Sequence, residues 1–186
     1  PKELIEKYEK KAEKLGLADE AANFDAGRER QVWPGTQEPR AVRIRQNEPV
    51  YAAMVESLDS AVGRVLQQLD ALNLRDKTAV IFTYDNGGLS TAEGSLTSYL
   101  PLRGGKGWIY EGGIREPLAI RWPGVTAAGT RCTVPAISTD FYPTMLEMAG
   151  LPAKPDQTVD GKSFVSLLRN PFAKFDRGPI FFHYPH

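Results

Sequence analysis

The chain is short of cysteine and histidine and carries no net charge. Cys132 is the one cysteine among 186 residues, which excludes a disulfide within the chain and leaves the compartment open. The 23 basic and 23 acidic residues balance. No stripe of arginine and lysine is interleaved with aromatic residues, so nucleic-acid binding is not expected. No apolar run approaches the roughly 20 residues that cross a bilayer, and the composition is that of a globular protein.

The most informative segment is an apolar strand that ends in oxygen-bearing side chains. Residues 78–84 are mostly apolar or β-branched without alternation, a pattern typical of a covered parallel sheet. Asp85 and Asn86 follow directly, and ligands of open α/β sheets gather beyond such strand ends. A carboxylate and an amide oxygen suit a hard cation such as calcium or magnesium. Gly87 and Gly88 allow the backbone to turn closely around an ion; an ordinary turn after a strand is the alternative.

A second segment, residues 100–117, places one lysine among five glycines. Glycines leave room for backbone and substrate to approach, and Lys106 offers a compact positive charge to an anion. Lys106 is followed by Gly107 rather than Ser or Thr, so the Walker pattern is not met, and the full GxGxxG fingerprint is absent. Nucleotide binding is therefore disfavoured.

Helices and strands alternate along the chain. Apolar residues at helical spacing predict a surface helix over 2–15 and a long helix over 50–72 that covers the sheet. Strands are expected at 78–84 and 117–122. This alternation predicts an α/β fold, a sandwich of a mostly parallel sheet covered by helices.

The remaining segments are shorter or irregular. We expect residues 23–49 to form a long surface connection, and residues 89–99 to be mobile until the substrate or the missing half orders them. Asp140 is expected to cap a helix that runs to Met148 and ends at Gly150. Another short helix is expected over 163–169.

The last residues contain the two histidines of the chain. Residues 179–186 are expected to form a strand that enters a smaller C-terminal antiparallel subdomain, so we divide the chain into 1–178 and 179–186. Histidine transfers protons or binds metals near neutral pH, which makes His183 and His186 candidates for a functional role. Pro185 disfavours a helix there, so their spacing does not by itself place both on one ligand.

These motifs, taken in order, resemble the later half of the sulfatase family, which belongs to the alkaline phosphatase superfamily. The resemblance spans roughly residues 46 to 186 and includes five further stretches: Tyr51–Asp59, Ile120–Gly124, Asp140–Gly150, Asp160–Ser163 and the aromatic tail. It implies that the chain is the C-terminal portion of a formylglycine-dependent, arylsulfatase-like enzyme.

The resemblance also implies roles for particular residues. Asp85 and Asn86 would be two ligands of a single calcium ion. Lys106 would be catalytic and would contact the sulfate group of the substrate, while His183 and His186 would line the substrate pocket. The implied reaction is calcium-dependent hydrolysis of a sulfate ester to an alcohol and inorganic sulfate.

The family's nucleophile is a formylglycine made from Cys or Ser in a CxPxR pattern, and the chain contains no such pattern. Cys132 is followed by Pro135 one place too late, and the arginine is missing; we expect it to be a small structural residue rather than a reactive thiol. The nucleophile, the other calcium ligands and a catalytic histidine are expected in a missing N-terminal half. This segment alone is expected to be inactive.

The resemblance implies a sulfated small molecule or sulfated carbohydrate as partner, no membrane span, and a periplasmic, extracellular or lysosomal location. The oligomeric state is open. One alternative is a phosphate or phosphonate ester hydrolase of the same superfamily, although its zinc-dependent members typically have histidine where this chain has Asn86. Activity ratios on aryl sulfate and aryl phosphate would separate the two. The other alternative is a non-catalytic, sulfatase-derived anion-binding protein, which an upstream nucleophile motif would exclude.

Overall fold

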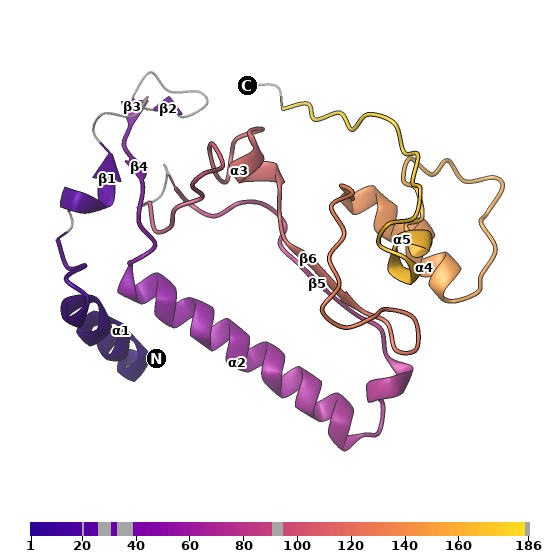
Figure 1. The fold of residues 1–186 in the computed structure, drawn as a ribbon, viewed down its shortest axis with the longest axis horizontal. Helices are drawn as coiled ribbons and strands as arrows, with labels where there is room; N and C mark the ends of the chain where they lie inside the picture. Colours follow the sequence, from indigo (N-terminus) through magenta and orange to yellow (C-terminus); the bar gives the residue numbers. More distant parts are fainter. Residues whose placement is uncertain (20, 26–30, 33–38, 91–94, 185–186) are drawn as a thin grey trace. The chain divides into compact units, whose positions relative to one another are not determined.

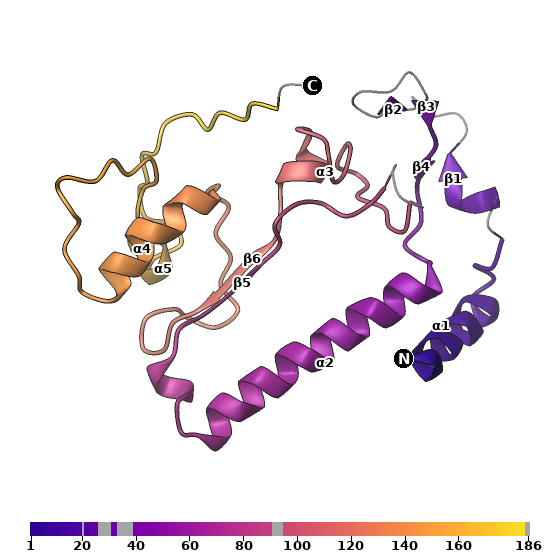
Figure 2. The same ribbon diagram turned by 180° about the vertical axis from the view of Figure 1, so that it is seen from behind.

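The computed structural model describes residues 1–19, 21–25, 31–32, 39–90 and 95–184. The chain divides into two compact units, drawn as ribbons in Figure 1 and from behind in Figure 2. Unit 1 comprises Pro1–Leu72, Thr83–Leu118 and Phe182–His186, and unit 2 comprises Asn73–Phe82 and Ala119–Phe181.

Two helices of unit 1 confirm the predictions made from apolar periodicity. Helix α1 spans Lys2–Lys14 and contacts helix α2, Pro49–Ala71. The Glu48 carboxylate accepts a hydrogen bond of 2.5 Å from the Tyr51 N–H, so Glu48 and Pro49 together begin α2. The Lys7 ammonium joins α1 to α2 through hydrogen bonds of 2.8 and 2.7 Å to the two Glu56 carboxylate oxygens.

The expected role of α2 as the cover of a sheet is wrong for the described residues. Its apolar stripe remains exposed, with relative exposures of 57% for Met54, 47% for Leu58 and 63% for Val65. Ala53 is the residue of α2 that is buried. The helix packed on α2 is α1, and 13 residues are too few to cover a helix of 23.

Short strands and a buried arginine interrupt the connection expected over 23–49. Strand β1 (Phe24–Asp25) pairs antiparallel with β4 (Val42–Arg43), and β2 (Gln31–Val32) pairs antiparallel with β3 (Pro39–Arg40). The Arg43 side chain is 4% exposed. Its guanidinium donates to the carbonyls of Arg45 and Ser95 and to the Asn47 amide oxygen. The segment is therefore not simply a surface connection.

The expectation of a mobile segment over 89–99 is also wrong where the structure describes it. Ser90, Thr97 and Ser98 are each at most 3% exposed. The Thr97 N–H donates to the Leu89 carbonyl at 3.1 Å. Residues 91–94 lie outside the described part of the chain. The flanking residues are held because their hydroxyl and backbone groups are paired inside unit 1.

Both predicted strands are confirmed, with narrower limits than expected. Strand β5 spans Val80–Thr83 and follows the 3-10 helix η2, Arg75–Lys77; it pairs with β6, Leu118–Arg121. Both strands are half-buried or exposed within the described residues, so β5 is not the fully covered strand that its sequence indicates. The described strands form three two-stranded sheets, and the mostly parallel sandwich stays a prediction.

The core of unit 2 forms where two helices meet. The 3-10 helix η3 (Ser138–Asp140) leads into α4, Phe141–Met148, which contacts α5, Val165–Arg169. The two helices lie side by side in Figures 1 and 2. Phe164, Val165 and Leu167 are at most 7% exposed. Gly150, at φ +67°, ends α4 as predicted, and its N–H donates to the Glu147 carbonyl at 3.1 Å.

Asp140 has a wider structural role than the predicted helix cap. Its fully buried carboxylate accepts hydrogen bonds from the backbone N–H groups of Ile137 and Lys162, each at 2.9 Å, and from both terminal nitrogens of Arg177. It makes no side-chain capping bond to α4 itself. Burial would raise the pKa of this carboxyl, but the bonds from Arg177 and the two backbone groups outweigh burial and hold the pKa below its usual value.

Two further expectations differ from the structure. Residues 179–184 form neither a strand nor a helix, because no described strand pairs with them. The division of the chain at residue 178 stays a prediction. Cys132 is exposed, so it is not a buried structural residue. No helix within the described ranges has the length and apolarity needed to cross a membrane.

Candidate functional site

The candidate site begins where strand β5 ends. Thr83 closes β5, and its hydroxyl donates to the Pro117 carbonyl at 3.0 Å, directly before β6. Asp85 is exposed and Asn86 is half-buried. The Asn86 amide nitrogen donates to one Asp85 carboxylate oxygen, and this bond does not use the Asn86 amide oxygen or the other Asp85 oxygen. The two predicted metal ligands are thus neighbours at a strand end.

Gly87, directly after Asn86, allows the backbone that follows β5 to lie close to the short helix α3, Glu111–Ile114. The Gly87 N–H donates to the Gly113 carbonyl at 3.2 Å. A methyl group at position 87 would overlap the Gly112 carbonyl oxygen. A side chain at Gly87 would therefore push the end of β5 away from α3.

Lys106 is tied to the same turn by its backbone. The Lys106 N–H donates to the Gly88 carbonyl at 2.9 Å. A Cβ atom at Gly105 would lie 2.5 Å from that same carbonyl oxygen and 2.5 Å from the Ser90 hydroxyl oxygen. The Ser90 hydroxyl in turn donates to the Gly104 carbonyl at 3.0 Å. The two glycine-containing segments, predicted separately, are therefore bound to each other, with the Lys106 side chain exposed.

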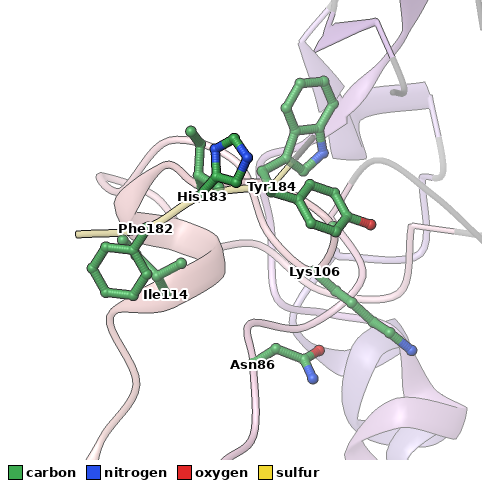
Figure 3. A pocket seen from close by; sticks show the side chains of 9 residues that line it. Asn86, Lys106, Ile114, Phe182, His183 and Tyr184 are labelled. Atoms are coloured by element: carbon green, nitrogen blue, oxygen red, sulfur yellow. The ribbon is translucent and has the colours of Figure 1, made fainter. Parts of the chain in front are cut away.

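A pocket of about 420 Å³ lies beside these residues. It is lined by Asn86, Lys106, Gly107, Trp108, Ile109, Ile114, Phe182, His183 and Tyr184. Figure 3 shows the Phe182, His183 and Tyr184 side chains reaching the pocket from the C-terminal segment. Pockets of this size, mostly apolar with a few polar groups, are typical small-molecule sites.

Aromatic side chains line the same pocket as Lys106, which the sequence reasoning missed. The rings of Trp108 and Tyr110 are stacked, with centroids 6.1 Å apart and planes 18° from parallel. The Arg103 guanidinium carbon lies 4.1 Å from the Tyr110 ring centroid. The alternation of Trp108 and Tyr110 beside Lys106 was the available signal.

Glu116 is the second residue that the sequence reasoning missed. Both of its carboxylate oxygens are buried and have no hydrogen-bond partner among the described residues. Burial raises the pKa of this carboxyl, and the negative charge of Asp85 raises it further. A charged residue two positions before the apolar strand β6 was the sequence signal.

The comparison with known families identifies the family of the chain. The family model described as Sulfatase matches residues 1–151. The chain belongs to the sulfatase family. The match begins earlier than the motifs at 46–186 indicated and ends at residue 151, so it includes α1 and the following connection but not residues 152–186.

Named sulfatases align with most of this chain. The "Sulfatase" of Formosa agariphila is 41% identical over 153 residues, which is 76% of this chain and 27% of that protein. The steryl-sulfatase of Homo sapiens is 36% identical over 140 residues, 73% of this chain and 24% of that protein. The sulfatase chain described here therefore spans 27% or less of the length of these two curated relatives.

Solved structures share the fold of this sulfatase chain. Ps i-CgsB in complex with k-i-k-neocarrahexaose aligns at 32% identity and a TM-score of 0.61, over 69% of this chain and 28% of that one. BT4656 in complex with its substrate, D-glucosamine-2-N,6-O-disulfate, aligns at 30% identity and a TM-score of 0.54, over 65% of this chain and 22% of that one.

The structure places the predicted site residues of this sulfatase as follows. Asn86, Lys106 and His183 line one pocket, and Asp85 is hydrogen-bonded to Asn86. His186 lies outside the described residues. The roles of all five residues stay predictions, although the grouping of three of them on one pocket agrees with a common site.

The residues at the end of β5 suit part of a calcium site. Asp85 and Asn86 offer a carboxylate and an amide oxygen, the donor atoms that calcium takes, and the unpartnered Glu116 carboxylate lies within electrostatic range of Asp85. The described residues contain no group of three or more His, Cys, Asp or Glu able to hold a metal. Two ligands fall short of the six to eight oxygens around calcium, so the described residues form an incomplete shell.

Proposed function

We propose that the full-length protein containing this chain is a calcium-dependent sulfatase that hydrolyses a sulfate ester to an alcohol and inorganic sulfate. The family membership supports the reaction class. The observation that carries the proposal is the shared pocket of Asn86 and Lys106, which joins a candidate metal ligand to a candidate sulfate-binding cation. The nucleophile, a formylglycine, is expected in the part of the protein outside this chain.

Lys106 is assigned to the sulfate group. Its backbone is fixed by the bond to Gly88, while its side chain is exposed at the pocket. The ammonium group would bind a non-bridging sulfate oxygen and offset the negative charge there as the ester bond to sulfur breaks. The Lys106 side chain is exposed at the pocket, so its compact ammonium group can reach an anion bound there.

Asp85 and Asn86 are assigned to calcium. Calcium, when bound, would supply Lewis-acid polarisation of a sulfate oxygen and a template for the reacting groups. The chain's contribution is to hold the two ligand side chains in place, since Asn86 is hydrogen-bonded to Asp85 and Gly87 packs on α3.

His183 and the aromatic residues are assigned to the organic part of the substrate. We propose a sulfated carbohydrate. Both solved structures named above were determined with carbohydrate ligands, and Trp108, Phe182 and Tyr184 give the pocket flat apolar surfaces on which the C–H faces of a sugar ring can pack. His183 can bond a sugar hydroxyl. A periplasmic, extracellular or lysosomal location is proposed with this substrate.

The test uses the full-length protein, purified with its formylglycine modification confirmed by mass spectrometry. Sulfate release is measured from D-glucosamine-2-N,6-O-disulfate, an oligosaccharide of carrageenan, a steryl sulfate and an aryl sulfate, and phosphate release from an aryl phosphate. We expect the carbohydrate sulfates to be hydrolysed fastest. Preference for the steryl or aryl sulfate would overturn the substrate class, and preference for the phosphate would overturn the reaction.

Lys106→Ala should lower kcat/KM by roughly 10²–10³-fold, because one charge-stabilising donor is removed. Lys154→Ala, at an exposed lysine outside the pocket, is the matched control and should leave kcat/KM unchanged. Near-normal activity of the Lys106 variant would contradict its catalytic assignment.

A further inference from the structure

The carboxylate of Glu116 is left without a partner in a place where its burial is unfavourable. Both oxygens are buried, and neither accepts a hydrogen bond among the described residues. An unpaired buried carboxylate is strongly disfavoured, and such groups in folded proteins usually have an ion, a water or a functional reason. The group therefore requires an explanation.

Two hydrogen bonds place Glu116 beside the candidate metal ligands. On one side of Asp85, the Thr83 hydroxyl donates to the Pro117 carbonyl at 3.0 Å. On the other side, the Gly87 N–H donates to the Gly113 carbonyl at 3.2 Å. The turn that holds Asp85 is thus joined at both ends to the segment that holds Glu116. These bonds hold the segments that carry Asp85 and Glu116 beside each other, and the charge of Asp85 acts on the Glu116 carboxyl.

Among the described residues, no cation forms a hydrogen bond with the Glu116 carboxylate. Its neighbour Arg115 donates instead to Glu111 at 3.2 Å, in an exposed pair. The charge of Asp85 acts on Glu116 with the same sign, which raises the pKa of the Glu116 carboxyl beyond the effect of burial. The Asp85 carboxylate is exposed, and the Glu116 carboxylate is buried without a partner. A cation bound at Asp85 would stabilise the charged form of both carboxylates.

We propose that Glu116 is a positioning residue that supplies negative charge to the calcium ion held by Asp85 and Asn86. The proposal rests on the function proposed above. Because the Glu116 oxygens are buried and make no hydrogen bond, the residue acts on the ion through its charge rather than as a ligand. In the absence of calcium the same charge destabilises the site.

The experiment compares calcium binding by full-length variants after treatment with a chelator. Calorimetric titration with calcium chloride should show about 10–100-fold weaker binding by Glu116→Gln, the range seen when outer-shell partners of metal ligands are changed. Glu116→Asp keeps the charge and should bind calcium more tightly than Glu116→Gln. Glu111→Gln is the matched control, because Glu111 is exposed and paired with Arg115, and it should bind as the unmodified protein does.

Thermal unfolding separates this role from a purely structural one. Without calcium, Glu116→Gln should raise the Tm, because an unpaired buried charge is removed; the rise in Tm on adding calcium should be smaller than in the unmodified protein. Equal calcium affinity of Glu116→Gln and the unmodified protein would overturn the inference while leaving the proposed function intact. If the unmodified protein binds no calcium, the calcium assignment of the proposed function fails and the inference fails with it.

Discussion

Single charged side chains hold separate parts of this chain together, and Asp140 shows the effect most clearly. Its carboxylate joins Ile137, Lys162 and Arg177, residues that lie up to 37 positions away along the chain. Neither Asp140 nor Arg177 is more than 11% exposed on its side chain. The pair is therefore weakly screened by water, and the loss of one partner leaves the other charge buried.

Asp140→Asn should destabilise the full-length protein by roughly 3–5 kcal/mol at pH 7, the usual effect of breaking a buried ion pair. The pKa of Asp140 is held below its usual value in the folded state, so its stabilisation is present above the unfolded pKa of about 3.9 and is lost as the pH falls through the folded pKa. The difference between variant and unmodified protein should therefore shrink below about pH 4. Urea unfolding at several pH values measures it.

Asp156→Asn is the control for this prediction, because Asp156 is exposed. It should change the unfolding free energy little at any pH. A destabilisation by Asp140→Asn that stays the same from pH 7 to pH 3 would show that the charge of Asp140 is not what stabilises this part of the fold.

At the scale of elements, the site depends on three backbone segments that lie so close to one another that only glycine fits at their contacts. The turn after β5, the loop around Lys106 and helix α3 are joined by bonds from Gly87 to Gly113 and from Lys106 to Gly88. Gly113 lies where a methyl group would overlap the Trp108 carbonyl oxygen. The glycines therefore determine where the pocket residues lie, although they contribute no side chain to it.

Gly113→Ala should destabilise the full-length protein by about 1–3 kcal/mol, because the added methyl group meets backbone atoms that cannot rotate away. The same substitution at Gly63, inside α2 with nothing within 4 Å of its Cβ position, should stabilise by about 0.5–1 kcal/mol because alanine favours a helix. Thermal denaturation of both variants measures these opposite shifts. Shifts of the same sign would contradict the close packing at α3.

At the scale of the whole chain, the sequence predicted helices and strands, which depend on neighbouring residues, and missed contacts between residues far apart in the sequence. The periodicity of α2 and the apolar run of β5 are local signals, and both elements are present. The burial of Arg43 depends on Ser95, 52 residues away. The burial of the Glu116 carboxylate without a hydrogen-bond partner depends on the packing around it. No pattern within a window of sequence contains such contacts.

The same reasoning explains the wrong prediction for the outer face of α2. Its apolar stripe was expected to be covered, and it is exposed within the described residues. Periodicity shows that a helix has an apolar face, but the partner of that face is a property of the rest of the fold.

The exposed apolar side chains lead to a prediction for the isolated chain. Met54, Val65 and Phe172 are 57%, 63% and 87% exposed, and the chain spans 27% or less of the length of the two curated relatives described above. We expect the 186-residue chain alone to bind the dye ANS strongly, because exposed apolar surface of this kind binds it. The full-length protein should bind less dye per molecule, since further residues would cover α2.

Replacing Met54 and Val65 together by lysine should reduce dye binding by the isolated chain, whereas Lys10→Glu and Lys14→Glu, on the already polar face of α1, should not. Weak dye binding together with a single cooperative unfolding transition would show that these residues form a self-sufficient fold, and the apolar face of α2 would then need no cover.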